Sequence, residues 1–280
     1  MDFKTRIKTI YGASALLTLI STLLLTLSFV LSFDEMNGYF EGGILPILFW
    51  ISFILGIALA FASAFLLQKD KIIKTDNSVG KVRTVYVILA VLLALFLLLF
   101  KLSSKSVYFT IAIFGACFFM LFIALCVSSG YQYSHIKAGA LLLSVLFPIL
   151  INTENNIVMS RHSNSIENTL TSFFVIAFLI YILYEGKRIF TGEHSRWHLA
   201  SMLLASHIGL ALSVSYVVAY GLGAVNERSR LYQILLILII SLFIETELVR
   251  FTKQSEARAK EEWDALKTPE QESTEEKITE

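Results

Sequence analysis

The chain has 280 residues, of which 56% are hydrophobic and only 16% are charged, whereas ordinary soluble domains carry about 25% charged residues. Lys and Arg lie outside the long apolar runs or at their ends, and the Asp, Glu and His residues within those runs are His207, Glu245 and Glu247. This segregation excludes an ordinary soluble domain and predicts an all-α, polytopic integral membrane protein. The formal net charge of +1 gives no reason to expect a nucleic acid partner.

Eight apolar runs predict eight transmembrane helices, because about 20 apolar residues span the hydrocarbon of a bilayer. The expected spans cover residues 10–33, 44–67, 84–100, 107–128, 138–152, 169–184, 199–223 and 232–250. The fifth and sixth runs are short, and Pro148 interrupts the fifth, which predicts a broken or re-entrant helix there. Residues 1–250 are therefore expected to form one transmembrane domain.

The distribution of basic residues predicts that both termini are cytoplasmic, because cytoplasmic loops carry an excess of Lys and Arg. With eight crossings, 18 of the 23 Lys and Arg residues fall inside and 5 outside. If the fifth run did not cross, the distribution would be 12 inside and 11 outside. The inner clusters also suit anionic lipids. The absence of any N-x-S/T acceptor in the sequence favours a bacterial cytoplasmic membrane.

Two of the predicted spans carry stripes of small or hydroxyl-bearing residues at every fourth position. The stripe of the first span is Ser14, Thr18, Thr22 and Thr26, and that of the second is Ser52, Gly56, Ala60 and Ala64. Such stripes are typical of close helix–helix contacts in membranes. A polar stripe that lines a solute path is the alternative interpretation.

The segment between the sixth and seventh spans, residues 185–198, is amphipathic and suits the headgroup layer. It brings four residues to the inner face that suggest a lipid-modifying enzyme: Glu185, Glu193, His194 and His198. The sequence contains no H-E-x-x-H motif, and Cys117 and Cys126, nine residues apart, point to opposite sides of one helix. We therefore expect no metal, no cofactor and no named reaction.

The seventh run, residues 199–223, is predicted to be the central helix of the bundle, with His207 near mid-depth. In the eighth run, Glu245 lies about 7–8 Å below the cytoplasmic boundary. Glu247 is three residues from Arg250 and is expected to pair with it. Ionisable residues inside a membrane mark functional sites by default. We therefore take His207 and Glu245 as candidate binding residues that face one another.

Beyond Arg250 the last span is predicted to continue as an exposed helix until Pro269, and the acidic end of the chain is expected to be disordered. Residues 251–280 thus form a charged cytoplasmic tail. Three classes of function stay open. The first is a small transporter, or the membrane subunit of one; the second is a sensor or accessory protein that binds a membrane partner or a second copy of itself. The third is a lipid-modifying enzyme.

Overall fold

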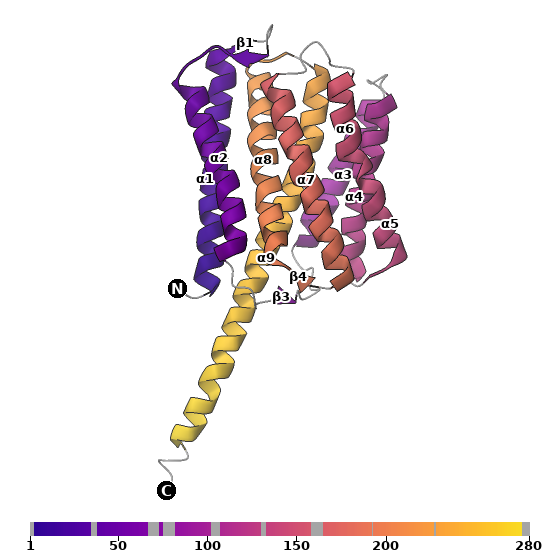
Figure 1. Ribbon diagram of the computed structural model, residues 1–280. Helices are drawn as coiled ribbons and strands as arrows, with labels where there is room; N and C mark the ends of the chain where they lie inside the picture. Colours follow the sequence, from indigo (N-terminus) through magenta and orange to yellow (C-terminus); the bar gives the residue numbers. More distant parts are fainter. Residues whose placement is uncertain are drawn as a thin grey trace.

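The computed structural model describes residues 3–34, 38–66, 73–74, 82–101, 107–129, 133–157, 165–191, 193–226 and 228–275. In this part of the chain the structure is an α-helical bundle (Figure 1). Its helices are α1 (Phe3–Ser32), α2 (Ile44–Leu66), α3 (Val82–Lys101), α4 (Val107–Ser129), α5 (His135–Ser144), α6 (Leu146–Ile157), α7 (Ile166–Thr191), α8 (Arg196–Gly221) and α9 (Arg228–Glu275). The prediction of an all-α fold is confirmed.

Five helical stretches are long and apolar enough to cross a membrane: Thr5–Ser32, Ile44–Leu66, Thr110–Ser129, Ile166–Thr191 and Arg196–Gly221. The outer surface of the bundle is correspondingly apolar, with side chains such as Leu23, Ile51 and Phe65 exposed. A soluble bundle would place polar groups there, whereas lipid tails accept apolar ones. By length and composition, the helices indicate an integral membrane protein.

The predicted fifth span is broken in the structure, as Pro148 suggested. α5 ends at Ser144, Val145 forms a turn, and α6 begins at Leu146. Pro148 thereby lies in the first turn of α6, where its missing N–H costs no intrahelical hydrogen bond. Gly115 of α4 packs against the backbone of Phe147 so closely that a Cβ at this position would overlap its nitrogen. The break is therefore fixed by a proline on one helix and a glycine on its neighbour.

α8 is the central helix of the bundle, and this prediction is confirmed. It packs against α1, α2, α7 and α9. Its described side chains are buried almost continuously from His198 to Gly209. Gly209 lets Ser241 of α9 and Phe174 of α7 approach the α8 backbone, because a Cβ there would overlap both side chains. Small residues at such points allow membrane helices to pack closely.

α1 begins, and α9 leaves the bundle, at the same end, which is the lower end in Figure 1. Two short strands at this end, β3 (Ile73–Lys74) and β4 (Glu193–His194), pair in antiparallel fashion. The strands β1 (Phe33–Asp34) and β2 (Tyr39–Phe40) form a hairpin at the opposite end. α9 continues well beyond the bundle and through Pro269 to Glu275, so the prediction that Pro269 ends the helix is wrong. A proline removes a single N–H donor, and in α9 the helix continues on both sides of it.

Candidate functional site

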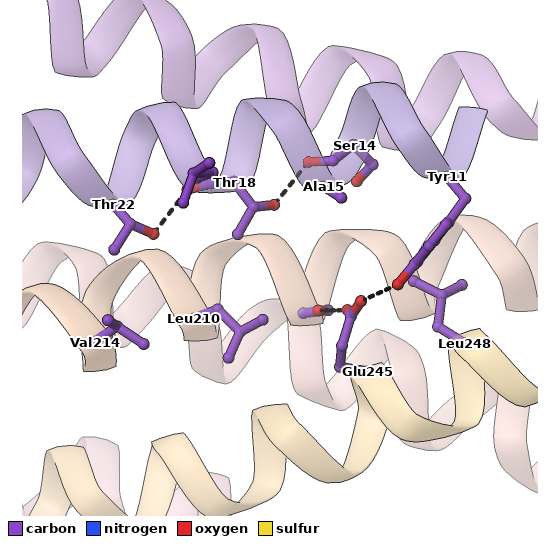
Figure 2. Close-up of a pocket in the computed structure, with 11 residues that line it drawn as sticks. Tyr11, Ser14, Ala15, Thr18, Thr22, Leu210, Val214, Glu245 and Leu248 are labelled. Carbon is purple, nitrogen blue, oxygen red and sulfur yellow. Dashed lines mark hydrogen bonds between the residues drawn. The ribbon is translucent and has the colours of Figure 1, made fainter. Parts of the chain in front are cut away.

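A groove of about 250 Å³ lies between α1, α8 and α9 (Figure 2). Its lining residues are Tyr11, Ser14, Ala15, Thr18, Leu19, Thr22, Ser206, Leu210, Val214, Glu245 and Leu248. Leu19 is 65% exposed, so the groove reaches the outer surface of the bundle rather than a closed interior. Thr22 lies eleven residues after Tyr11, which corresponds to about 16 Å along α1.

Glu245 is the charged group of this groove and is half-buried in it. The Tyr11 hydroxyl on α1 donates a 2.9 Å hydrogen bond to Oε1, and the Ser206 hydroxyl on α8 donates to Oε2. Figure 2 shows the Glu245 side chain pointing toward the Tyr11 hydroxyl. An ionised carboxylate has about four lone-pair positions, so two donors leave acceptor capacity for a bound ligand.

The wall that α1 contributes is the hydroxyl stripe of the first predicted span. Ser14, Thr18 and Thr22 line the groove at one-turn intervals. The Thr18 hydroxyl donates to the Ser14 carbonyl oxygen at 2.9 Å, and the Thr22 hydroxyl donates to the Thr18 carbonyl oxygen at 2.7 Å. The hydrogens of these hydroxyls are therefore directed along their own helix. The stripe therefore both lines the groove and contacts α8, where Thr18 lies 2.9 Å from His207 and the Thr22 carbonyl accepts a 2.8 Å hydrogen bond from Ser215.

The stripe of the second span is, by contrast, a helix contact. Ser52, Ala60 and Ala64 are buried against α1 and α8, and Ser52 accepts a 3.0 Å hydrogen bond from Ser21 of α1. A Cβ at Gly56 would overlap the imidazole of His207. Gly56 thus provides the space in α2 that the histidine ring occupies.

His207 is 1% exposed and is held between α1 and α2. Its Nε2 lies 3.2 Å from the carbonyl oxygen of Phe53, which can only accept, so Nε2 carries a hydrogen. Its Nδ1 lies 2.9 Å from the Thr18 hydroxyl oxygen. In a neutral ring this Nδ1 accepts, and the Thr18 hydrogen is then shared between Nδ1 and the Ser14 carbonyl oxygen. His207 therefore contacts Thr18, a residue of the α1 wall, without lining the groove itself.

No hydrogen bond among the described residues joins the two candidate binding residues, His207 and Glu245. Glu245 bonds to Tyr11 and Ser206, whereas His207 bonds to Thr18 and the Phe53 carbonyl. Ser206 and His207 are consecutive on α8, so their side chains point about 100° apart. Ser206 consequently reaches α9, while His207 reaches α1 and α2. The expected direct pair is replaced by two separate contacts with α1.

A second polar cluster is buried beside the groove, at the end of the bundle where the N-terminus lies. Its members are 6% exposed or less: Tyr86 of α3, Glu185 and Arg188 of α7, His198 of α8, and Glu247 and Arg250 of α9. Glu185 accepts hydrogen bonds from Arg188 and, at 2.7 Å, from His198 Nε2. Arg188 and Arg250 both contact Glu247, at 3.5 and 3.3 Å. The predicted Glu247–Arg250 pair is confirmed.

The contacts of this ionic cluster join two carboxylates, two guanidinium groups and the imidazole of His198. Tyr86 also donates to Glu247. Each carboxylate therefore has protein partners on at least two helices, which fits a structural role better than a catalytic one. The side chains of Glu193 and His194 lie outside the described residues. Among the described residues, no group of three or more His, Cys, Asp and Glu side chains could hold a metal ion.

Two parts of this arrangement were not predicted from the sequence. Tyr11 and Ser206 were not recognised as partners of Glu245, because they lie 234 and 39 residues away from it in the chain. The burial of Glu185 and His198 was also not foreseen, since residues 185–198 were assigned to the headgroup layer. One signal was available: Glu185–Arg188 and Glu247–Arg250 are both Glu-x-x-Arg pairs at the C-terminal ends of apolar runs.

The fold and the site together define a membrane helix bundle with a lateral groove that contains one carboxylate. No protein-family model, curated protein or solved structure matches this chain. The function must therefore be argued from the groove and its surroundings.

Proposed function

We propose that this protein is a small membrane transporter, or the membrane subunit of one, and that the groove between α1, α8 and α9 holds its solute. The supporting observation is Glu245, a half-buried carboxylate that lines this groove and has acceptor capacity left after its bonds to Tyr11 and Ser206. Carboxylates within transmembrane segments are rare and mark proton, ion and substrate pathways. Glu245 is thus the residue that binds the solute or the coupling proton.

The proposal includes eight spans with both termini cytoplasmic, in a bacterial cytoplasmic membrane. α3, the α5–α6 pair and the first part of α9 would add three crossings to the five helices that are long and apolar enough. α1 begins, and α9 leaves the bundle, at one end, which agrees with an even number of crossings (Figure 1). The excess of Lys and Arg assigns that end to the cytoplasm and to contact with anionic lipids.

The broken α5–α6 helix and the groove lie on different sides of α8, because α6 packs against α4 and α7 while the groove involves α1 and α9. Transporters commonly combine interrupted helices with a site near the middle of the membrane. We therefore expect α1 and α2 to move against α8, on which both helices pack.

Native mass spectrometry of the protein, extracted from its own membranes into lipid discs, tests this proposal. We expect a small molecule that is retained by the wild type and lost from Glu245→Gln, a variant of the same shape without the charge. Reconstituted wild-type protein should then exchange the labelled molecule across liposomes. Thr246→Ala is a matched control, since the Thr246 hydroxyl donates to the Leu242 carbonyl and does not line the groove. Equal retention in Glu245→Gln would contradict the assignment.

A sensor or accessory protein is the second candidate, and α9 is the observation that favours it. This helix of 48 residues continues for 25 residues beyond Arg250 and projects away from the bundle (Figure 1). A helix that leaves its own bundle is available to a membrane protein partner or to a second copy of the chain. In the same mass spectrometry experiment, a stoichiometric partner chain that disappears when the chain is truncated after Lys253 would favour this function over transport by the chain alone.

A further inference from the structure

The chemistry of the groove also restricts what it can bind, and this inference rests on the proposed function. The four lining hydroxyls whose donated hydrogen bonds are described all direct their hydrogens to the protein itself. Tyr11 and Ser206 donate to Glu245, Thr22 donates to a backbone carbonyl, and Thr18 donates to a carbonyl or to His207. A hydroxyl whose hydrogen is already donated to another protein atom can only accept a hydrogen bond from a ligand.

Glu245 is also an acceptor, and the Ser14 hydroxyl, which lines the groove as well, can accept or donate. None of the described residues that line the groove is Lys, Arg or His. An anion in this groove would meet a carboxylate without a compensating cation, and burial of such an unpaired charge is costly. The site therefore selects a ligand that carries hydrogen-bond donors and positive charge.

The other lining residues require part of the ligand to be apolar. Leu210 and Val214 of α8 lie opposite the hydroxyls of α1 (Figure 2). Leu19 and Leu248 add apolar surface at the sides. The volume of about 250 Å³ is slightly below the 300–1,000 Å³ that is usual for small-molecule sites. A short aliphatic chain fits this space, and its continuation would leave the groove where Leu19 is exposed.

A bare metal cation fits less well. Mg²⁺ and Ca²⁺ require six or more oxygen ligands that converge on one point. The oxygens of Ser14, Thr18 and Thr22 instead follow one another along α1 at intervals of about one turn, 5.4 Å. They form a row beside the groove rather than a ring around an ion.

We propose that the groove binds a primary alkylammonium ion, with its ammonium group on Glu245 and its chain between the hydroxyl row of α1 and Leu210 and Val214 of α8. The ammonium group supplies three N–H donors to the acceptors that the groove presents. A quaternary ammonium of the same chain length has the same charge but no N–H, so it cannot satisfy the Glu245 oxygens. The loss of a hydrogen bond that involves a charged group weakens binding by about tenfold or more.

Isothermal titration calorimetry of the full chain in lipid discs, corrected with empty discs, tests this assignment. The probes are hexylammonium, hexyltrimethylammonium and hexanoate, which share a chain length and differ in charge and donors. We expect hexylammonium to bind at least about tenfold more tightly than hexyltrimethylammonium, and hexanoate not to bind. Equal binding of the two cations, or binding of hexanoate, would overturn the ligand class.

Two variants locate the binding site. Glu245→Gln should weaken hexylammonium binding by about tenfold or more, while the control Thr246→Ala leaves it unchanged. If Glu245→Gln does not fold, Val214→Phe serves instead, because it fills the apolar side of the groove without altering any polar group there. Unchanged binding in whichever variant folds would overturn the assignment to the groove.

Exchange of labelled hexylammonium across proteoliposomes, corrected with protein-free liposomes, separates this inference from the proposed transport. Hexylammonium that binds in the groove but is not exchanged faster than in protein-free liposomes would keep the ligand class and contradict its transport. Exchange of another solute, with hexylammonium unbound, would contradict the ligand class and keep the transport function.

Discussion

Glu245 and Glu247 lie two residues apart on α9, and their side chains have entirely different partners. Glu245 lines the groove with Tyr11 of α1 and Ser206 of α8, whereas Glu247 is 3% exposed and contacts Arg188 of α7. Positions two apart on a helix point about 200° from each other. One turn of α9 therefore connects the groove with the ionic cluster, and a displacement of α9 at one site also shifts the other.

The ionic cluster is expected to be essential for the stability of the bundle. In Glu247→Gln, Arg188 and Arg250 each lose a carboxylate contact in a buried environment, and Arg188 keeps its contact with Glu185. Removal of one partner from a buried ion pair typically costs about 3–5 kcal/mol. We expect a large decrease in the thermal unfolding midpoint of the protein in detergent, measured by size-exclusion chromatography after heating.

Glu41→Gln is the matched control, because Glu41 is an exposed carboxylate in the turn after β2. It should change the free energy of unfolding by no more than about 0.5 kcal/mol, so the unfolding midpoint stays nearly the same. A midpoint in Glu247→Gln equal to that of this control would show that the cluster contributes nothing to stability.

Much of the fold was predictable because the bilayer imposes simple rules on sequence. The expected second run, 44–67, corresponds to α2 at Ile44–Leu66, and the expected fourth run, 107–128, corresponds to α4 at Val107–Ser129. Hydrophobicity over about 20 residues and a proline within a short run are local signals. They identify where a helix begins, ends or breaks without any knowledge of its neighbours.

The contacts of the candidate site could not be predicted in the same way. His207 contacts Thr18, a residue 189 positions away in the chain, and Glu245 contacts Tyr11, 234 positions away. Which helices become neighbours depends on packing among many similar apolar surfaces, and these carry little sequence information. His207 and Glu245 stand out in the sequence as ionisable residues within apolar runs, but their partners required the three-dimensional arrangement.

Gly56 is predicted to be required for the position of His207. A Cβ in Gly56→Ala would overlap the imidazole ring, so either the ring or α2 must move. Overpacking of a close contact typically costs about 1–3 kcal/mol. We expect a lower unfolding midpoint in Gly56→Ala and its partial recovery in the double variant with His207→Ala, since the smaller side chain leaves room for the added methyl group.

Gly139→Ala provides the comparison, because beyond the local backbone of α5 no atom of the described residues lies within 4 Å of a Cβ at that position. It should be neutral or slightly stabilising, as Ala favours a helix over Gly by roughly 0.5–1 kcal/mol. If the effects of Gly56→Ala and His207→Ala simply add, the two residues are not in the contact described here.

Gly115 is predicted to behave differently, because its close neighbour is backbone. A Cβ at Gly115 would overlap the backbone nitrogen of Phe147, and no rotamer change can relieve this overlap. Gly115→Ala should therefore lower the unfolding midpoint, and the second substitution Phe147→Ala should not restore it. Recovery in the double variant would indicate that the Phe147 side chain, rather than the break between α5 and α6, causes the conflict.

Tyr11 and Ser206 are predicted to position the Glu245 carboxylate for its ligand. Tyr11→Phe and Ser206→Ala each remove one hydroxyl that donates to Glu245 while keeping most of the packing. With one donor gone, the carboxylate oxygen is free to rotate out of the groove, so each variant should weaken hexylammonium binding by about tenfold. The two effects should not add in the double variant, because both act through the same carboxylate. The measurement is calorimetry in lipid discs with Thr246→Ala as the control, and full affinity in both single variants would show that Glu245 needs neither hydroxyl.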